Sequence, residues 1–190
     1  MRWMWIDRVV ELEPERRMVA VKNISLAEEH LHDHFAADLE RGLPAAPVMP
    51  ASLIIEGMAQ TAGILVGHAN AFREKVILAK IGSATIERDA TPGCTLVYEA
   101  EIERLDNAAA ATRGTIRLID HAARLGPHPT GDERGEPIGA VSLMFSHIDK
   151  NLAGSSFPEH NFVFGEGFKT LLRTSGITTD ESAAHAHHGP

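Results

Sequence analysis

The chain has 190 residues, a length sufficient for one domain with a substantial hydrophobic core. Its formal net charge of −8 argues against a general nucleic-acid-binding protein, which needs a surplus of Lys and Arg. The single cysteine, Cys94, excludes an internal disulfide framework, no apolar stretch reaches about 18 residues, and the first residues do not predict a signal peptide. We therefore expect a cytoplasmic protein with no nucleic-acid or membrane partner.

The first 50 residues predict a β-hairpin followed by irregular chain. Residues 9–12 and 17–22 are rich in β-prone side chains, and the Glu-Pro-Glu-Arg sequence between them is typical of a turn. Residues 24–46 show no clear periodicity. Pro47 and Pro50 favour extended backbone in the residues that precede them.

A long helix is predicted over residues 51–69, directly after Pro50. This segment is apolar on almost every side, which is typical of a buried helix. Glu56 interrupts the apolar run, and a buried carboxylate needs a partner or a proton. Gln60 lies one turn later on the same face and is a candidate partner.

The rest of the first 150 residues predicts a sheet. Strands are expected over 76–88, 96–105, 112–119 and 138–148, and in the second of these Glu99, Glu101 and Glu103 alternate with apolar residues, as in a strand with one wet face. Residues 121–136 are rich in Gly, Pro and charge and are interpreted as a long exposed loop. One long buried helix and antiparallel strands at hairpin spacing indicate an α+β fold, with a curved sheet wrapped around the helix.

Residues 151–190 are expected to form a C-terminal extension of the domain formed by residues 1–150. A short amphipathic helix is predicted over residues 168–173, and residues 181–190 have the composition of a disordered end.

Several short segments, in a fixed order, resemble one enzyme family. They are Ala-Val-Lys-Asn (20–23), Glu28, His-Phe (34–35), Pro-Val-Met-Pro (47–50) and Leu-Ile-Ile-Glu-Gly-Met-Ala-Gln (53–60). Over roughly residues 5–148 the sequence resembles the bacterial 3-hydroxyacyl-(acyl-carrier-protein) dehydratases of fatty acid biosynthesis. The resemblance implies the hotdog fold, a curved antiparallel sheet around one long helix, which agrees with the layout expected from the residue patterns.

The resemblance implies dehydration of a (3R)-3-hydroxyacyl thioester to the trans-2-enoyl thioester. His34 would remove the α-proton as the base, because histidine exchanges protons near neutral pH. Glu56 would be the acid that protonates the departing hydroxyl, since apolar surroundings disfavour its ionised form. The backbone N–H groups of Ala51 and Ser52, at the start of the helix, would stabilise negative charge on the thioester oxygen.

The same resemblance assigns orienting roles to Gln60 and Val48 and requires no metal or organic cofactor. It implies a substrate linked to acyl carrier protein or to coenzyme A. In this family the His and the Glu of one site come from different subunits, so we expect a homodimer or a hexamer built from dimers.

Two departures from the family pattern concern the site directly. The link from His34 to Glu56 is about eight residues longer than usual, with the extra residues near 38–45; this insertion either loops out over the entrance or displaces His34. A displacement of about 1 Å can cost roughly a hundredfold in rate. In addition, Ala51 replaces a family glycine, which is tolerated only if the backbone there suits a residue with a Cβ.

Two other functions remain open. The first is an acyl-thioester hydrolase of the same fold, in which a carboxylate of the helix activates water. The second is a non-catalytic acyl-binding or assembly protein, in which the insertion has disrupted the geometry between His34 and Glu56 and the C-terminal extension is the functional part.

Some features have simpler interpretations. The histidines at positions 30, 32 and 34 alternate, but no convincing further ligands accompany them, so we expect solvated loop residues and no metal site. Cys94 is expected to pack as a small apolar residue. The basic residues Arg73, Lys75 and Arg88 are either a basic lip for an acidic carrier protein or, as we favour, scattered surface charge.

The C-terminal extension carries four phenylalanines, too many for a purely solvated segment. They are Phe157, Phe162, Phe164 and Phe168. They could cover a hydrophobic face of the domain, cap an acyl tunnel or contact a neighbouring subunit. We favour packing within the protein's own assembly over an external partner.

Overall fold

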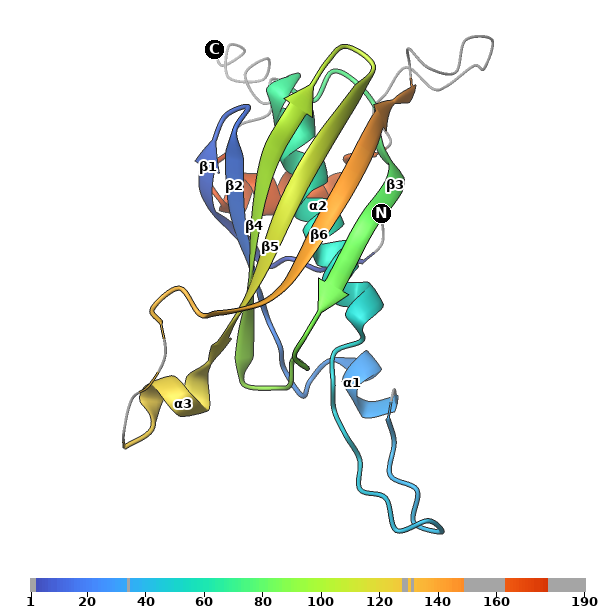
Figure 1. Cartoon of the computed structure of the whole chain (residues 1–190), viewed down its shortest axis with the longest axis vertical. Coiled ribbons are helices and arrows are strands. Elements are labelled where there is room, and N and C mark those ends of the chain that lie inside the picture. The colour runs from blue at the N-terminus through green and yellow to red at the C-terminus, as the bar shows by residue number, and fades with distance from the viewer. Residues whose placement is uncertain (1–2, 34, 128–129, 131, 149–162, 178–190) are drawn as a thin grey trace, which may run out of the picture.

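The computed structural model describes residues 3–33, 35–127, 130, 132–148 and 163–177 (Figure 1). Within them, six antiparallel strands form one sheet in the order β1-β2-β4-β5-β6-β3. The sheet curves around the long helix α2, Ala51–Ala69. The predicted α+β architecture is therefore confirmed.

Each predicted strand is present and differs from its expected bounds by a few residues. The strands are β1 (Arg8–Glu13), β2 (Arg17–Asn23), β3 (Val76–Ile86), β4 (Cys94–Leu105), β5 (Ala109–Asp120) and β6 (Glu136–His147). The turn between β1 and β2 closes with Arg16 N–H donating to Glu13 O at 3.1 Å. Cys94, the first residue of β4, is buried as expected.

Two predictions of irregular chain were wrong at short helices. Helix α1, Glu29–Asp33, lies in the region expected to be irregular, and α3, His121–Leu125, lies at the start of the expected loop. The side chain of Asp120 caps α3 by accepting from the N–H groups of Ala122 and Ala123. One or two turns are too short for a helical period to show in the sequence, so only local capping could indicate such elements.

Helix α2 lies in the concavity of the sheet, and its apolar side chains form the centre of the core. Met58, Ile64 and Leu65 are completely buried, and strand residues such as Leu96 and Leu143 belong to the same cluster. At full burial, each such side chain contributes about 1.5–3 kcal/mol of hydrophobic stabilisation.

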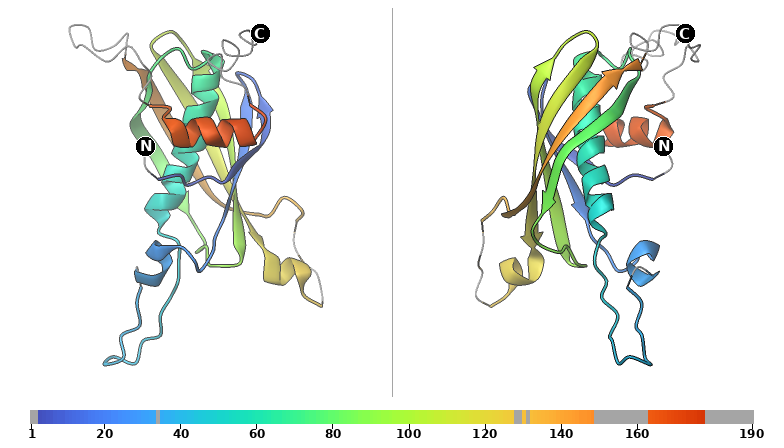
Figure 2. Two further views of the ribbon diagram at one scale, coloured as in Figure 1. Left: turned by 180° about the vertical axis from the view of Figure 1, so that it is seen from behind. Right: turned by 45° about the vertical axis from the view of Figure 1, so that its right-hand side comes forward.

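The last helix, α5 (Glu166–Thr174), crosses α2 on the side that the sheet leaves open (Figure 2). It is slightly longer than the helix predicted over residues 168–173. Phe168, Leu171 and Leu172 are buried in the same core cluster as α2, so this part of the extension packs on the domain. The predicted disordered end and two of the four phenylalanines, Phe157 and Phe162, lie outside the described residues.

The two edge strands of the sheet have different surroundings. At β1, the N–H of Val9 donates to the Ser175 Oγ just after α5, at 3.0 Å. At β3, Ile77, Leu78 and Ile81 remain exposed, with 37%, 38% and 44% of their surface accessible. An exposed, apolar edge strand is a ready site for pairing with another chain.

Candidate active site

A cavity of about 240 Å³ lies against one face of α2. The helix contributes Glu56, Ala59, Gln60 and Gly63, whose spacing places them on a single face. The remaining lining residues are apolar and come from β3, β6 and the C-terminal segment: Val76, Ile77, Leu78, Phe145, Val163, Phe164 and Phe168. The cavity therefore has one polar end, formed by Glu56 and Gln60, and otherwise apolar walls.

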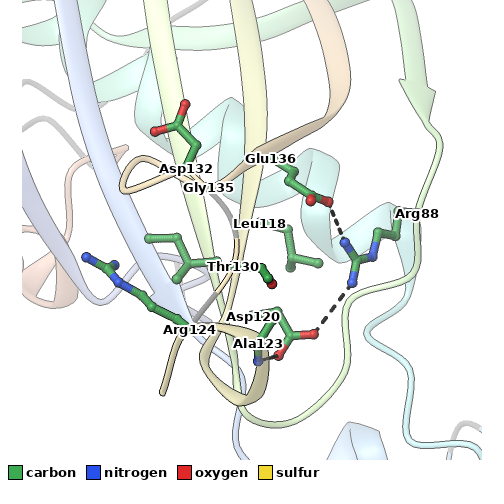
Figure 3. A pocket seen from close by; sticks show the side chains of 10 residues that line it. Arg88, Leu118, Asp120, Ala123, Arg124, Thr130, Asp132, Gly135 and Glu136 are labelled. Carbon is green, nitrogen blue, oxygen red and sulfur yellow. Dashed lines mark hydrogen bonds and ion pairs between the residues drawn. The ribbon is translucent and has the colours of Figure 1, made fainter. Parts of the chain in front are cut away.

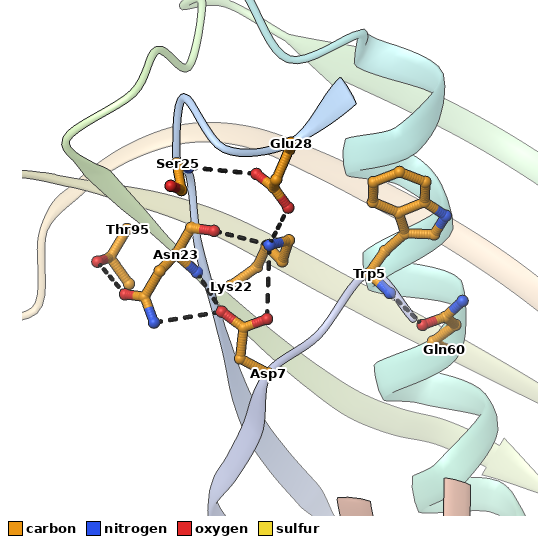
Figure 4. A network of polar contacts seen from close by, with 8 residues as sticks. All are labelled: Trp5, Asp7, Lys22, Asn23, Ser25, Glu28, Gln60 and Thr95. Carbon is orange, nitrogen blue, oxygen red and sulfur yellow. Dashed lines mark hydrogen bonds and ion pairs between the residues drawn. The ribbon is translucent and has the colours of Figure 1, made fainter. Parts of the chain in front are cut away.

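Gln60 holds Glu56 in place, as the spacing of the two residues predicts. Its Nε2 donates to Glu56 Oε1 and to the backbone carbonyl of Trp3, each at 3.1 Å. Its Oε1 accepts from the N–H of Trp5 at 2.8 Å, as Figure 4 shows. Because Gln60 is buried and bonded at both ends of its amide, its side chain has little freedom, and Glu56 inherits that order.

Glu56 itself is only partly buried, in contrast to the expectation that the helix is enclosed on every side. Exposure decreases along α2: Ala51 and Ser52 are exposed, Glu56 is intermediate, and burial is continuous from Gly57 to Ala62, although Ile54 is already buried. The carboxylate therefore lies at the boundary between the core and a surface that this chain alone does not cover.

Ala51 and Ser52 begin α2 as predicted. The first amides that bond back to the chain are those of Leu53 and Ile54, which both donate to Pro50 O. The amides of Ala51 and Ser52 precede them and have no intrahelical acceptor. Ala51 has helical backbone and does not have a positive φ, so a Cβ is accommodated where the family has glycine.

His34 lies outside the described residues, so its position relative to Glu56 remains a prediction. The insertion that follows it is described: Ala46 N–H donates to Phe35 O at 3.0 Å, and Asp38 and Leu43 form a β-bridge. The ribbon projects away from the domain (Figure 1). Leu39, in the turn between Asp38 and Leu43, is 90% exposed. Residues 38–45 therefore loop outward, and the alternative that they displace His34 stays a prediction.

Between the insertion and α2, backbone hydrogen bonds hold the chain to the rest of the domain. Val48 N–H donates to Ala46 O, and Met49 N–H donates to Ala90 O, both at 2.8 Å. Met49 is buried and Val48 is partly buried.

A buried lysine, which the residue patterns did not predict, anchors the chain upstream of His34. Lys22 Nζ donates to Glu28 Oε1 at 2.6 Å and to Asn23 O at 2.7 Å, and lies 3.4 Å from Asp7 Oδ1 (Figure 4). Glu28 also accepts from Ser25 N–H, so the turn after β2 is tied to the sheet. Lys22 and Glu28 both belong to the short segments that resemble the dehydratase family, and their opposite charges were the signal in the sequence that could have predicted the ion pair.

His30 is not a solvated loop residue as expected. It lies in α1, and its ring meets Trp5 edge to face, with the ring centroids 5.0 Å apart. Trp5 in turn meets Trp3 edge to face at 6.3 Å. The aromatic stack connects α1 to the same N-terminal segment that bonds Gln60, and so links two parts of the site region.

The predicted alternative of a basic lip is not what the structure shows. Arg73 and Lys75 precede β3, whereas Arg88 follows its far end. Arg88 belongs to a second pocket, where it pairs with Glu136 at 2.7 Å and Asp120 at 3.6 Å (Figure 3). Lys75 is buried. The three cations therefore form no common surface.

Among the described residues, no group of three or more His, Cys, Asp or Glu side chains is placed to hold a metal ion. In the same part of the chain, no helix has the length and apolarity that a membrane crossing requires.

Comparison with solved structures assigns the fold class. The dehydratase heterocomplex ApeI:P from Xenorhabdus doucetiae matches with a TM-score of 0.54 and 15% identity, over 78% of this chain and 85% of that chain. A hypothetical thioesterase from Streptococcus pneumoniae, solved with coenzyme A, matches with a TM-score of 0.50 and 8% identity, over 73% and 83%. The protein has the hotdog fold, as predicted.

Sequence comparison assigns the family within that fold. Residues 2–121 match the FabA-like domain family. The 3-hydroxyacyl-[acyl-carrier-protein] dehydratase FabZ of Listeria monocytogenes is 35% identical over 112 residues, which are 58% of this chain and 72% of that protein. This chain belongs to the FabA-like family, and the predicted resemblance is confirmed.

Proposed function

We propose that the protein dehydrates a (3R)-3-hydroxyacyl thioester to the trans-2-enoyl thioester in fatty acid biosynthesis. The observation that supports this most directly is the position of Glu56, a hydrogen-bonded carboxyl at the polar end of an otherwise apolar cavity. Such a cavity suits an acyl chain whose reacting carbons lie beside the carboxyl. The relatives named as dehydratases agree with this reading.

The chemistry needs one base and one acid. His34 takes the α-proton from C2, and the electron pair of that C–H bond forms the double bond between C2 and C3. Glu56 gives its proton to the 3-hydroxyl, which leaves as water when the C3–O bond breaks. Transfer of the proton from His34 back to Glu56 restores the starting state, so no cofactor enters the balance.

Negative charge develops on the thioester oxygen while the α-proton leaves. The free amides of Ala51 and Ser52 lie at the positive end of the α2 dipole, five and four residues before Glu56, and would donate to that oxygen. Gln60 is the positioning residue for Glu56. Val48 lies in the hydrogen-bonded segment just before α2, and we assign it the role of orienting His34.

The active form is proposed to be a homodimer, or a hexamer built from such dimers. Strand β3 offers an exposed apolar edge of eleven residues, and a second copy of this chain is the occupant that would extend the sheet there. In this arrangement His34 of one subunit would serve Glu56 of the other. The partly exposed first turns of α2 would then be covered by the partner.

The substrate would be carried by acyl carrier protein or by coenzyme A, and the reaction would take place in the cytoplasm. The single cysteine, Cys94, is a buried free thiol, which suits a reducing compartment.

The deciding experiment incubates the purified protein with a 3-hydroxyacyl thioester and follows enoyl-thioester absorbance and free thiol together. Enoyl product without thiol, abolished by H34A, is the expected result. Free thiol would instead establish the hydrolase, a function with which the fold is also compatible. No reaction with either carrier would leave the acyl-binding protein as the correct assignment.

The shared site has its own test. H34A and E56Q variants are each expected to be inactive, because each lacks one half of every site. After the two are mixed and exchanged, one site in the mixed dimer has both native residues, so part of the activity should return. Sedimentation would show a dimer or larger for all samples, and a monomeric, fully active protein would contradict the proposal.

A further inference from the structure

We infer that the C-terminal segment Val163–Phe168 forms the end wall of the acyl cavity and limits the length of the acyl chain that the protein accepts. The inference rests on the proposed function, because it assigns the apolar part of the cavity to the acyl chain. The segment lies beyond residues 2–121, the part of the chain that matches the FabA-like family. The wall therefore comes from the C-terminal extension, outside the part of the chain that matches the family.

The cavity has a direction that places this wall opposite Glu56. Along α2 its lining residues run from Glu56 through Ala59 to Gly63, and Phe164 lies farther along the same helix, against Gly67. Gly67 lies about one helical turn beyond Gly63, and about 16 Å along the helix axis from Glu56 at the usual rise per residue. Substrate that enters with its thioester near Glu56 therefore points its acyl end at Phe164.

Phe164 fits closely into the helix surface. A Cβ at Gly67 would lie only 2.5 Å from the Phe164 Cζ, so the aromatic ring occupies the space that any larger residue at position 67 would fill. The ring also meets Phe72 and Phe168 edge to face, with centroid separations of 4.9 and 5.7 Å. Three aromatic rings thus support one another at the closed end.

The segment behind the wall is fixed to the domain, so the wall is not easily displaced. Leu171 and Leu172 of α5 are buried in the core, and Ser175 bonds the edge of β1 through Val9. The cavity of about 240 Å³ is also slightly smaller than the roughly 300 Å³ at which small-molecule pockets begin. A rigid wall on a small cavity gives a sharp upper limit to chain length.

Two variants should change the accepted chain length in opposite directions, and a third is a control. F168A removes a ring from the lining and should lengthen the accepted chain. G63A adds a methyl group inside the cavity and should shorten it; its Cβ would stand 3.5 Å from Phe145 Cε1, an ordinary contact. L172A is the matched control, because Leu172 is equally buried in α5 but does not line the cavity.

Two measurements are made on each full-length variant. Calorimetry with saturated acyl-coenzyme A thioesters of increasing length reports binding without turnover, and kcat/KM with the corresponding 3-hydroxyacyl thioesters reports the reaction. For F168A, the preference for the first excluded length over the shortest chain should rise about tenfold or more, since one methylene in a tight pocket is worth that much. G63A should change this preference in the opposite direction, and L172A should leave it unchanged.

The outcomes separate the two proposals. If the chain-length limit in binding moves with F168A and G63A but no protein dehydrates, the wall stands and the proposed function fails. If dehydration occurs and the limit does not move, or moves equally with L172A, the wall is overturned. Should F168A fail to fold, F168L provides a smaller shift in the same direction, and G63A tests independently that the acyl chain occupies this cavity.

Discussion

The two halves of α2 make different contributions, and the boundary falls between Glu56 and Gly57. The first half, Ala51 to Glu56, is exposed or partly buried except at Ile54, and it carries two free amides and a carboxyl. The second half, Gly57 to Gly67, is buried apart from Gly63, which faces the cavity. One continuous helix therefore anchors the fold with its second half and presents reactive groups with its first, so that their geometry inherits the rigidity of the core.

The strongest test of this division is E56Q in the first half. The amide keeps the size of the carboxyl but cannot donate the acid's proton, so kcat should fall by about a hundredfold to ten-thousandfold. Enoyl-thioester formation provides the rate, and the thermal melting curve should remain close to wild type. The control is E101Q on the exposed face of the sheet, which should change neither. Unfolding of E56Q would show that this half is structural as well.

In the second half, G57A should affect stability first. A Cβ at this position would lie 2.5 Å from Tyr98 Cζ and 2.8 Å from Trp5 O, so neighbouring chain must move. Overpacking of this kind costs about 1–3 kcal/mol. Urea denaturation should show a lower midpoint with an unchanged slope. An unaltered midpoint would mean that the close approach of Tyr98 to the helix is not maintained in solution.

Tyr98 allows the same contact to be tested from the sheet. Its hydroxyl is buried and has no hydrogen-bond partner among the described residues, so Y98F should raise the free energy of unfolding by about 1 kcal/mol. Burial raises the pKa of Tyr98, with a smaller contribution from Asp7. The free energy of unfolding of the wild-type protein is therefore independent of Tyr98 ionisation below the unfolded-state pKa of about 10. It falls as pH rises above that value, because the phenol ionises more readily in the unfolded chain than in the folded one.

Alkaline denaturation of wild type and Y98F gives the measurement. The gain in stability of Y98F should grow above about pH 10, because the variant has no phenol to ionise in its unfolded state. A constant difference between the two proteins at all pH values would argue that Tyr98 is hydrated in solution.

The smallest expected effect is that of G63A on stability. Alanine is favoured over glycine inside a helix by up to about 1 kcal/mol, and the new methyl group meets only Phe145 at 3.5 Å. The melting temperature should therefore rise slightly, opposite in sign to G57A on the same helix. Equal losses in the two variants would remove the distinction between a glycine required by close packing and one that faces a cavity.

Local patterns in the sequence determined much of the fold. The start and end of α2 were predicted correctly because Pro50 and a long apolar run are local signals. The alternation in residues 96–105 identified β4, since the side-chain period of a strand is visible in the sequence. The apolar segment 53–60 identified Glu56 as its one carboxylate, and the one-turn spacing to Gln60 predicted the hydrogen bond between them.

Tertiary structure alone decided how these parts become a site. Gln60 bonds Trp5 across 55 residues, and Phe164 packs against Gly67 across a still longer separation. No local pattern encodes such contacts, because they depend on how the sheet curves and on where the chain returns after β6. The partial exposure of Glu56 and the apolar walls of its cavity arise in the same way, from the packing of distant segments around a helix that the sequence had already defined.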